Sequence, residues 1–510
     1  MKEQIPFTLR PEKPEPIMFS MVAEYFGLPF ENNDVAVTGI SMNTGDLRPG
    51  DLFVAMPGLK THGAKFFAKA LELGAVALIT DQAGLEEIGD PGVPFALLEE
   101  PRKHLGDLAA FVYSNTGSNL QKFGTTGTNG KTSTSYLLEA ILRQLGRVTG
   151  LTSTAERHIA GEVIVSRLTT PESTEMQALM ARMRERGVQS VAIEVSAQAL
   201  SQLRVDGLFF DVVGFTNLSH DHFDDYPNFE TYLRAKAELF TKKRAKKGVV
   251  CLDSEFGQQF CQLSEIAFTT ISSRSDVAAE WQVRVTEQTP THTAFTLSGP
   301  NGEQLSTRIG LLGIHMASNA GLALVMAIEA GFSWQAVAEA VKNGIDAYLP
   351  GRTENVSAAT GPNVYVDFGH SPDAFLNTLQ SLRAVTTGRL YMVFGADGDR
   401  DPSKRPDMAR VAAQNSDVVI ITDHHPRFEE PASIRRVLFD SAKDAVPAIE
   451  IYEVSPPEQA IRKAVSLAQP GDAILWAGPG HQDYRDIQGK RTPYSARAEA
   501  RAALKENGWS

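Results

Sequence analysis

The stretch Gly124-Thr-Thr-Gly-Thr-Asn-Gly-Lys-Thr-Ser133 decides the fold of the middle of this chain. It stands directly before residues 133–145, where apolar side chains recur with the spacing of a helix. The backbone N–H groups of such a loop, together with the N-terminus of the following helix, can cradle phosphate groups. Lys131 would then reach the β- and γ-phosphates of a nucleotide, and the Thr132 hydroxyl would bind Mg²⁺.

The loop departs from the strict phosphate-loop pattern at one position. That pattern asks for glycine at position 125, where this sequence has Thr125, and the glycines fall instead at 124, 127 and 130. The loop predicts nucleotide binding. By itself it does not separate a kinase, a hydrolase, a ligase and a transport ATPase.

The pattern on both sides of the loop predicts an α/β fold in three domains. Loop and helix are followed by apolar runs at 191–195 and 211–215, an order typical of a parallel sheet with right-handed crossovers. This central P-loop domain is expected over residues 116–348. Residues 1–115 alternate apolar runs (51–55, 75–80) with a helix-like segment (64–73), which predicts a smaller α/β domain. Residues 349–510 form the third domain, Rossmann-like, with buried-strand signatures at 364–368, 390–394, 418–422 and 473–477.

Composition narrows the class of protein. Of 510 residues, 42% are hydrophobic and 22% charged, as in ordinary globular proteins. The net charge of −12 argues against nucleic acid as a partner, because binding to a phosphate backbone needs a basic surface. No apolar run approaches the roughly 18 residues of a membrane span, and Cys251 and Cys261 are too few for a disulfide framework. We therefore expect a cytoplasmic protein without membrane insertion.

Five segments in the middle of the chain resemble, in order, the central domain of the Mur ligase family, and within it the MurE type. They are TGTNGKTS at 126–133, LTTPE at 168–172, EVSAQALSQLR at 194–204, TNLSHDHFD at 216–224 and YLRAKAELF at 232–240. The resemblance implies an ATP-dependent amide ligase of peptidoglycan synthesis. Its substrates would be ATP, UDP-MurNAc-L-Ala-D-Glu and a free amino acid, expected to be a diamino acid such as lysine, ornithine or diaminopimelate. Mg²⁺ would be the cofactor and an acyl phosphate the intermediate. A monomer is expected.

The resemblance also implies catalytic roles for Lys131, Glu194, His222 and Lys236. Glu194 and His222 would hold a second Mg²⁺ between the γ-phosphate and the substrate carboxylate. Lys236 aligns with a lysine that is carbamylated in the family, so the metal ligands would be Thr132, Glu194, His222 and modified Lys236. Simpler interpretations exist for two of them: His222 as a capped loop histidine, and Lys236 as a surface lysine on a helix over 229–240.

Two further sets of residues match binding positions of the family. In the first domain the match rests on the motifs PGDLFVA at 49–55 and THG at 61–63, although the usual Asp-Ser-Arg before them is Asn43-Thr44-Gly45 here. The residues expected to bind UDP-MurNAc-dipeptide are Thr44, Thr61, His62, Gly63, Thr169, Thr170, Ser196, Gln202 and Arg204. Those expected to bind ATP are Gly127, Thr128, Asn129, Gly130, Lys131, Thr132, Ser133, His370 and Asp373.

The segments that select the incoming amino acid are where the sequence departs most from the family. The usual Asp-Asn-Pro-Arg is His424-His425-Pro426-Arg427, and the usual Gly-Lys-Gly-His-Glu is the segment GPGHQ at 478–482. Both carboxylates expected beside a distal ammonium are thus missing, unless Glu429, Glu430 or Asp483 replaces them. Lysine, ornithine, a different diaminopimelate isomer and a residue without a side-chain amine all stay open. The expected amino-acid-binding residues are Arg400, which would hold the α-carboxylate, with His424, His425, Arg427, Gly478 and Gln482.

Two rival functions remain: another carboxylate–amine ligase such as a folylpolyglutamate synthase, and a non-catalytic nucleotide-binding module. The motifs at 49–63 argue against the first, because that relative lacks such an N-terminal domain. The combination of Lys131, Glu194, His222 and Lys236 argues against the second, since a module that only binds nucleotide has no need of it.

Overall fold

The computed structural model describes residues 9–31, 33–58, 60–221 and 225–510. The chain forms two compact units, each assembled from separate stretches. The first comprises residues 1–126, 146–213 and 235–247, and the second residues 127–145, 214–234 and 248–510. Three elements have residues in both: β13 (Phe210–Phe215), α8 (Phe229–Ala237) and β14 (Ala245–Cys251).

The N-terminal part of the first unit is built on a five-stranded sheet of order β2-β7-β6-β5-β4, parallel except for β2 against β7. All residues of β5 and β6 are buried, as expected of parallel strands covered on both faces. This confirms the predicted strand at 51–55, whereas the predicted helix over 64–73 is a 3-10 turn followed by α2. The elements are β1 (Ile17–Met18), α1 (Phe19–Tyr25), β2 (Phe30–Glu31), β3 (Ala36–Val37), β4 (Gly39–Ser41), β5 (Asp51–Ala55), η1 (Gly63–Phe66), α2 (Phe67–Glu72), β6 (Ala77–Thr80), α3 (Gln82–Ile88), β7 (Phe95–Leu97) and α4 (Pro101–Val112).

The first unit also contains strands of a larger sheet, in the order β11-β10-β9-β12-β8. Strand β12 runs parallel to both β8 and β9, while β10 and β11 add an antiparallel hairpin at the edge. The parallel strands confirm the prediction for this part of the chain. The elements are β8 (Gln121–Thr126), β9 (Thr149–Thr152), β10 (Glu156–Ile159), β11 (Glu162–Val165), α6 (Ser173–Glu185), β12 (Ser190–Glu194), α7 (Ala197–Ser201) and η2 (Glu238–Phe240).

In the second unit, the large sheet continues as β15-β16-β17-β18. Strands β16, β17 and β18 pair antiparallel and form a ribbon that the sequence reading did not predict. Side chains of β17 alternate between buried and half-buried positions, the pattern of a sheet with one face on the core. The elements are α5 (Lys131–Gln144), α9 (Gly257–Leu263), β15 (Ala267–Ser272), β16 (Trp281–Gln288), β17 (Thr293–Ser298), β18 (Gln304–Ile309), α10 (Ile314–Glu329) and α11 (Trp334–Val341).

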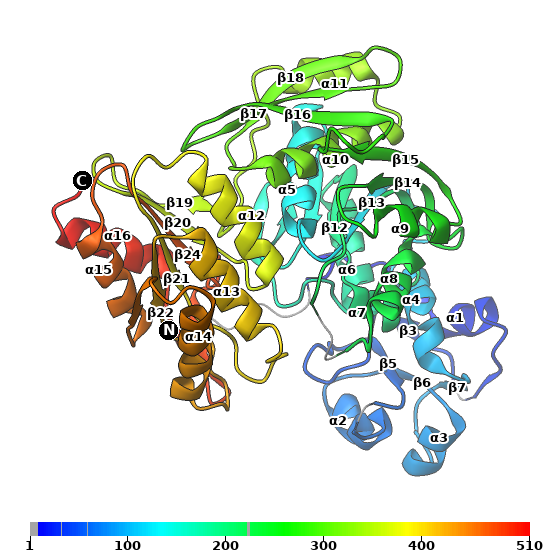
Figure 1. The fold of residues 1–510 in the computed structure, drawn as a ribbon. Coiled ribbons are helices and arrows are strands. Elements are labelled where there is room, and N and C mark those ends of the chain that lie inside the picture. Colours follow the sequence, from blue (N-terminus) through cyan, green and yellow to red (C-terminus); the bar gives the residue numbers. More distant parts are fainter. Residues whose placement is uncertain (1–8, 32, 59, 222–224) are drawn as a thin grey trace. The chain divides into compact units, whose positions relative to one another are not determined.

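The C-terminal part of the second unit is a six-stranded sheet of order β19-β20-β24-β21-β22-β23, parallel except for β19 (Figure 1). Helices α12, α13 and α14 cover one face, and α15 and α16 cover the other. All four strands predicted for this region are confirmed. The elements are β19 (Glu354–Asn355), β20 (Asn363–Asp367), α12 (Pro372–Arg383), β21 (Leu390–Phe394), α13 (Arg405–Asn415), β22 (Val418–Ile421), α14 (Pro431–Ala445), β23 (Glu450–Glu453), α15 (Pro457–Leu467), β24 (Ala473–Ala477), β25 (Tyr484–Ile487), β26 (Lys490–Pro493) and α16 (Ala496–Glu506).

Both cysteines are free thiols, Cys251 buried and Cys261 half-buried. Across the described residues, no helix combines the length and the apolar character needed to cross a membrane.

Two neighbouring residues of α14 allow a matched test of the C-terminal core. Leu438 is fully buried against the sheet, whereas Val437 is 40% exposed. We expect Leu438→Ala to lower the free energy of unfolding by about 2–5 kcal/mol, because it leaves a cavity. Val437→Ala should change it by about 0.5 kcal/mol or less. Urea unfolding followed by tryptophan fluorescence measures both, and equal shifts would contradict this packing of α14.

Candidate active site

The phosphate loop lies between the end of β8 and the start of α5, as predicted. Helix α5 begins at Lys131, so the loop residues 127–130 lead directly into its N-terminus. The Lys131 ammonium donates to the Thr128 carbonyl oxygen at 2.9 Å. The Asn129 carbonyl oxygen accepts a hydrogen bond from the Thr216 hydroxyl at 2.6 Å. These bonds hold the loop in a defined shape.

Gly127 is required by the close approach of this loop to the segment after β13. Its φ is +147°, and a Cβ there would lie 1.9 Å from the Thr216 hydroxyl oxygen. No larger residue fits without moving that segment. Glycine at 127, which the sequence reading included in the ATP-binding set, therefore has a steric reason.

Two of the predicted ATP-binding residues around the phosphate loop, Asn129 and Thr132, contact residues of the C-terminal part. The Asn129 side chain donates to Asp373 Oδ2 at 3.0 Å, and the Thr132 hydroxyl accepts from Arg352 Nη2 at 2.9 Å. Burial raises the pKa of Asp373, against the effect of the bond from Asn129. His370 lies nearby in sequence, with Nδ1 2.9 Å from the Phe368 carbonyl oxygen. Thr132 and Ser133 are buried in the first turn of α5, and Thr128 just before it is also buried.

Glu194 stands at the carboxyl end of β12 and is 2% exposed. Its Oε2 accepts the Thr154 backbone N–H at 2.8 Å, and its Oε1 accepts the Thr154 hydroxyl at 3.0 Å. Thr154 hydroxyl oxygen lies 3.0 Å from that of Thr169. The sequence reading missed Thr154. The available signal was its place two residues beyond β9, the parallel neighbour of β12, since parallel strands end at the same edge.

A hydrogen-bonded network, buried at Thr170 and exposed at Gln202, joins the predicted dipeptide-binding residues around β12 through Arg204 Nη1, which lies 3.5 Å from the Thr170 carbonyl oxygen. The Thr170 hydroxyl donates to the Glu194 carbonyl oxygen at 2.8 Å and accepts the Ser196 N–H at 3.1 Å. Arg204 donates to the Gln202 side-chain oxygen at 2.6 Å. Thr170, Ser196, Gln202 and Arg204 are thus brought together.

Arg204 is not a free cation in this network. Its Nε lies 2.8 Å from Glu172 Oε1, and Arg102 Nη1 lies 2.7 Å from the other oxygen of the same carboxylate. Two arginines share one glutamate, which leaves one net positive charge. Glu172 and Arg102 were not among the predicted site residues, although Glu172 belongs to the quoted LTTPE motif.

The predicted residues of the N-terminal sheet lie after two adjacent parallel strands. Thr44 follows β4, while Thr61 and His62 lie between β5 and η1, which begins at Gly63. His62 Nδ1 accepts the Ala64 N–H at 3.0 Å, so its proton is on Nε2, which faces Asp81 Oδ1 at 3.1 Å. The four residues therefore share one edge of the sheet.

Of the two remaining residues with proposed metal roles, His222 and Lys236, the structure describes only Lys236. His222 lies outside the described residues. Lys236, in α8, is 1% exposed and among the largest fully buried side chains. The interpretation of Lys236 as a surface lysine is therefore wrong.

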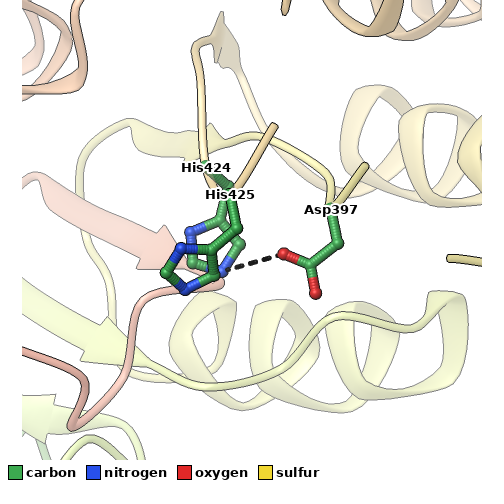
Figure 2. Close-up of side chains that lie close together, drawn as sticks. All are labelled: Asp397, His424 and His425. Carbon is green, nitrogen blue, oxygen red and sulfur yellow. Dashed lines mark ion pairs between the residues drawn. The ribbon is translucent and has the colours of Figure 1, made fainter. Parts of the chain in front are cut away.

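Loops after three adjacent parallel strands, β24, β21 and β22, carry the predicted amino-acid-binding residues. His425 Nε2 lies 2.8 Å from Gln482 Oε1, and Gly478 lies beside the His424 ring. Arg400 is exposed on the loop after β21. That same loop contributes Asp397, which the sequence reading missed: its carboxylate points toward the two imidazoles (Figure 2) and lies 3.6 Å from both His424 Nε2 and Arg427 Nη2.

The carboxylates proposed as replacements for the missing ones are already paired or exposed. Glu429 lies 2.8 Å from Arg405, Asp483 lies 3.1 Å from Arg497, and Glu430 is exposed. Burial lowers the pKa of His424 to about 3, so this ring is neutral near pH 7. The permanent charges near this ring are therefore Asp397 and Arg485, whose Nε donates to the His424 carbonyl oxygen at 3.2 Å, while Arg427 lies on the far oxygen of Asp397.

Gly351 lies against the loop that follows β24. Its φ is +64°, and a Cβ there would lie 2.1 Å from the His481 backbone nitrogen and 2.2 Å from the Gly480 carbonyl carbon. The adjacent residue, Arg352, is the one that donates to Thr132. Residues 351 and 352 thus touch both the first turn of α5 and the loop that carries Gln482.

Family models match most of the chain. The Mur ligase family catalytic domain matches residues 36–113, the Mur ligase middle domain residues 125–327, and the Mur ligase glutamate ligase domain residues 351–480. The chain is 52% identical over 508 residues to the UDP-N-acetylmuramyl-tripeptide synthetase of Leifsonia xyli, covering 99% of each chain. It is 40% identical over 504 residues to the UDP-N-acetylmuramoyl-L-alanyl-D-glutamate–2,6-diaminopimelate ligase of Streptomyces avermitilis, covering 97% of this chain and 98% of that one.

Solved structures agree with these matches. A structure of a UDP-N-acetylmuramoyl-L-alanyl-D-glutamate–2,6-diaminopimelate ligase superposes with a TM-score of 0.67 at 25% identity, over 97% of this chain and 100% of that one. Folylpolyglutamate synthase of Mycobacterium tuberculosis shares the fold, with a TM-score of 0.61 at 19% identity over 81% of this chain and 95% of that one. The chain belongs to the Mur ligase family of ATP-dependent ligases.

Proposed function

We propose that this ligase adds the third amino acid to UDP-MurNAc-L-Ala-D-Glu in peptidoglycan synthesis. The observation that carries the proposal is the 52% identity, over 99% of both chains, to a tripeptide synthetase. Matches to three successive family domains, at 36–113, 125–327 and 351–480, support the proposed division into a uridine-nucleotide part (1–115), an ATP-binding part (116–348) and an amino-acid-binding part (349–510). A monomer acting in the cytoplasm stays the prediction.

The proposed chemistry has two steps. The D-Glu carboxylate attacks the γ-phosphate of ATP to give an acyl phosphate and ADP, and the amine of the free amino acid then attacks the acyl carbon, releasing phosphate and forming the amide. Lys131, at the start of α5, would stabilise the charge on the transferred phosphoryl group. Arg400, an exposed cation on the loop after β21, would hold the α-carboxylate of the amino acid.

Two described residues suit Mg²⁺, which prefers oxygen ligands. The Thr132 hydroxyl stands in the first turn of α5, and the Glu194 carboxylate is buried and oriented by Thr154. Thr132 would hold the Mg²⁺ of the nucleotide, and Glu194 a second Mg²⁺ that neutralises the repulsion between the γ-phosphate and the substrate carboxylate. His222 remains a proposed ligand outside the described residues.

We also propose that Lys236 is carbamylated. Its nearly complete burial supports this, since burying an ammonium group is costly, whereas a carbamate would be a metal ligand. The same burial makes the side chain a poor candidate for a solvating surface role.

The direct test supplies UDP-MurNAc-L-Ala-D-Glu, Mg-ATP and single amino acids in turn, and measures phosphate release and product mass. We expect release that depends on both the nucleotide dipeptide and one class of amino acid. No dependence on any amino acid, with the dipeptide present, would reject the proposed function.

Lys131→Ala should lower kcat by about 100-fold or more, because it removes the positive charge that stabilises the transferred phosphoryl group. Lys342→Ala is the matched control: this lysine is exposed and paired with Glu339. Steady-state kinetics under saturating substrates measures both variants. Wild-type turnover by Lys131→Ala would contradict the role of the loop.

Thr154→Val tests the orientation of Glu194. The substitution keeps the shape and the backbone N–H but removes the hydroxyl that donates to the carboxylate. We expect kcat to fall by about tenfold and the Mg²⁺ concentration for half-maximal activity to rise, since groups that orient ligands have effects of this size. Thr154→Ser should behave like the wild type. Unchanged Mg²⁺ dependence in the valine variant would count against this role.

A further inference from the structure

The loops after β21, β22 and β24 enclose the carboxylate of Asp397, which has no role in the reaction steps proposed above. Asp397 comes from the first loop, His424, His425 and Arg427 from the second, and Gln482 from the third. Because these strands are adjacent and parallel, the loops meet at one edge of the sheet. Figure 2 shows the Asp397 carboxylate facing the two histidine rings.

Asp397 lacks close partners for its side chain. Oδ1 is buried and has no hydrogen-bond partner among the residues that the structure describes. His424 Nε2 lies 3.6 Å from Oδ1, and Arg427 Nη2 lies 3.6 Å from Oδ2. Both distances exceed that of a hydrogen bond. Leaving a buried charged acceptor unsatisfied is costly, so the carboxylate is suited to receive a donor from a ligand.

The acceptors next to Asp397, on His425 and Gln482, already take part in hydrogen bonds. The backbone N–H of Asp486 fixes the direction of these bonds. The Asp486 N–H donates to His425 Nδ1 at 2.9 Å, so the proton of this ring is on Nε2. Nε2 therefore donates to Gln482 Oε1 at 2.8 Å. This bond takes one of the two lone pairs of Gln482 Oε1, and the amide carries no negative charge. Gln482 is therefore a weaker partner for an ammonium group than the glutamate found there in relatives.

The same bonds argue against a metal ion as the occupant. Asp397, His424 and His425 offer potential ligand atoms within 4.8 Å of one another. Coordination by His425 would, however, break one of its two hydrogen bonds and require loss of a proton or of the Asp486 bond. An organic cation needs no such change, because it uses only the open oxygen of Asp397.

Among the carboxylates near these loops, Asp397 is the one suited to bind an ammonium group. Glu429 and Asp483 are each paired with an arginine, and neutral His424 does not compete for the carboxylate as a cation. Arg427 lies on the oxygen opposite to the open one. A primary ammonium at Oδ1 and the guanidinium at Oδ2 would then share one carboxylate, an arrangement that the arginine pair on Glu172 also shows in this chain.

We propose that Asp397 binds the side-chain ammonium group of the incoming amino acid, which is therefore a diamino acid. This rests on the proposed ligase function and names the class of amine that it uses. A residue without a side-chain amine, left open by the sequence, is excluded by the proposal. Arg427 either keeps its place beside Asp397, as with lysine or ornithine, or binds a distal carboxylate, as with diaminopimelate.

The experiment compares diamino acids with uncharged analogues of similar length. Phosphate release and product mass are measured with L-lysine, L-ornithine and meso-diaminopimelate, and with L-norleucine and L-homoserine. We expect kcat/KM for one of the first three to exceed that for both uncharged analogues by about 100-fold or more, the discrimination typical of a site built for a polar group. The best substrate also shows whether Arg427 binds a distal carboxylate.

Asp397→Asn should raise KM for the preferred amino acid by about 10- to 100-fold, the effect of removing a charged hydrogen bond. The KM values for ATP and for the nucleotide dipeptide should stay within about threefold, which also shows that the variant is folded. Asp444→Asn, which changes an exposed carboxylate of α14, is the control and should leave all three KM values unchanged.

Two further variants separate binding from positioning. If Asp397 only positioned Arg427, Asp397→Asn would preserve the preference for lysine over norleucine and would match Arg427→Ala; we expect it instead to abolish that preference. Asp397→Asn/His424→Asp, which returns a carboxylate to the pocket, should restore part of the affinity.

The outcomes distinguish the two levels of proposal. No phosphate release with any amino acid would reject the ligase function itself. Turnover with norleucine or homoserine equal to that with the diamino acids, an unchanged KM in Asp397→Asn, or stoichiometric binding of Zn²⁺ alone that Asp397→Asn removes would each overturn the role of Asp397 while leaving the ligase function intact.

Discussion

Parallel strand pairing requires that all strands of a sheet end at the same edge, and the sites of this chain lie at such edges. In the first unit, Glu194 at the end of β12 and Thr154 after β9 meet because these strands are parallel neighbours. In the C-terminal sheet, the loops after β24, β21 and β22 bring together residues between 397 and 482 for the same reason. Segments far apart in sequence thereby become neighbours without any local signal.

Buried parallel strands were predictable from sequence because both of their faces are covered. Strands β5, β21 and β24 have the predicted bounds, since each is a continuous apolar run that ends abruptly. The ribbon of β16, β17 and β18 was not predicted. Strands β16 and β18 are polar at every second position, and residues 281–309 show neither a motif nor a long apolar run. Alternation over six residues in β17 was the available signal.

The candidate site was predictable where a short motif carries the chemistry. The phosphate loop, its helix and Glu194 are of this kind. Partners that depend on distant segments were missed: Thr154, the Glu172 carboxylate between Arg102 and Arg204, and Asp397. Burial also changed the interpretation of single residues, because Lys236 is enclosed rather than exposed on its helix. Sequence patterns give the type of side chain, whereas hydrogen bonds decide which atoms stay available.

The position of Gly351 bears on how parts of such ligases could be exchanged by protein engineering. A side chain at this residue would collide with the backbone at 480 and 481, and the next residue, Arg352, reaches the helix of the phosphate loop. In a chimera that takes only its C-terminal sheet from a relative, residues 351 and 352 would lie where the two parent sequences meet. To preserve the turn, the donor segment would have to bring both glycines, 351 and 480, while the recipient keeps Thr132. The segment that can be exchanged between such ligases would therefore be limited by this close backbone contact, and not by the ends of the domains.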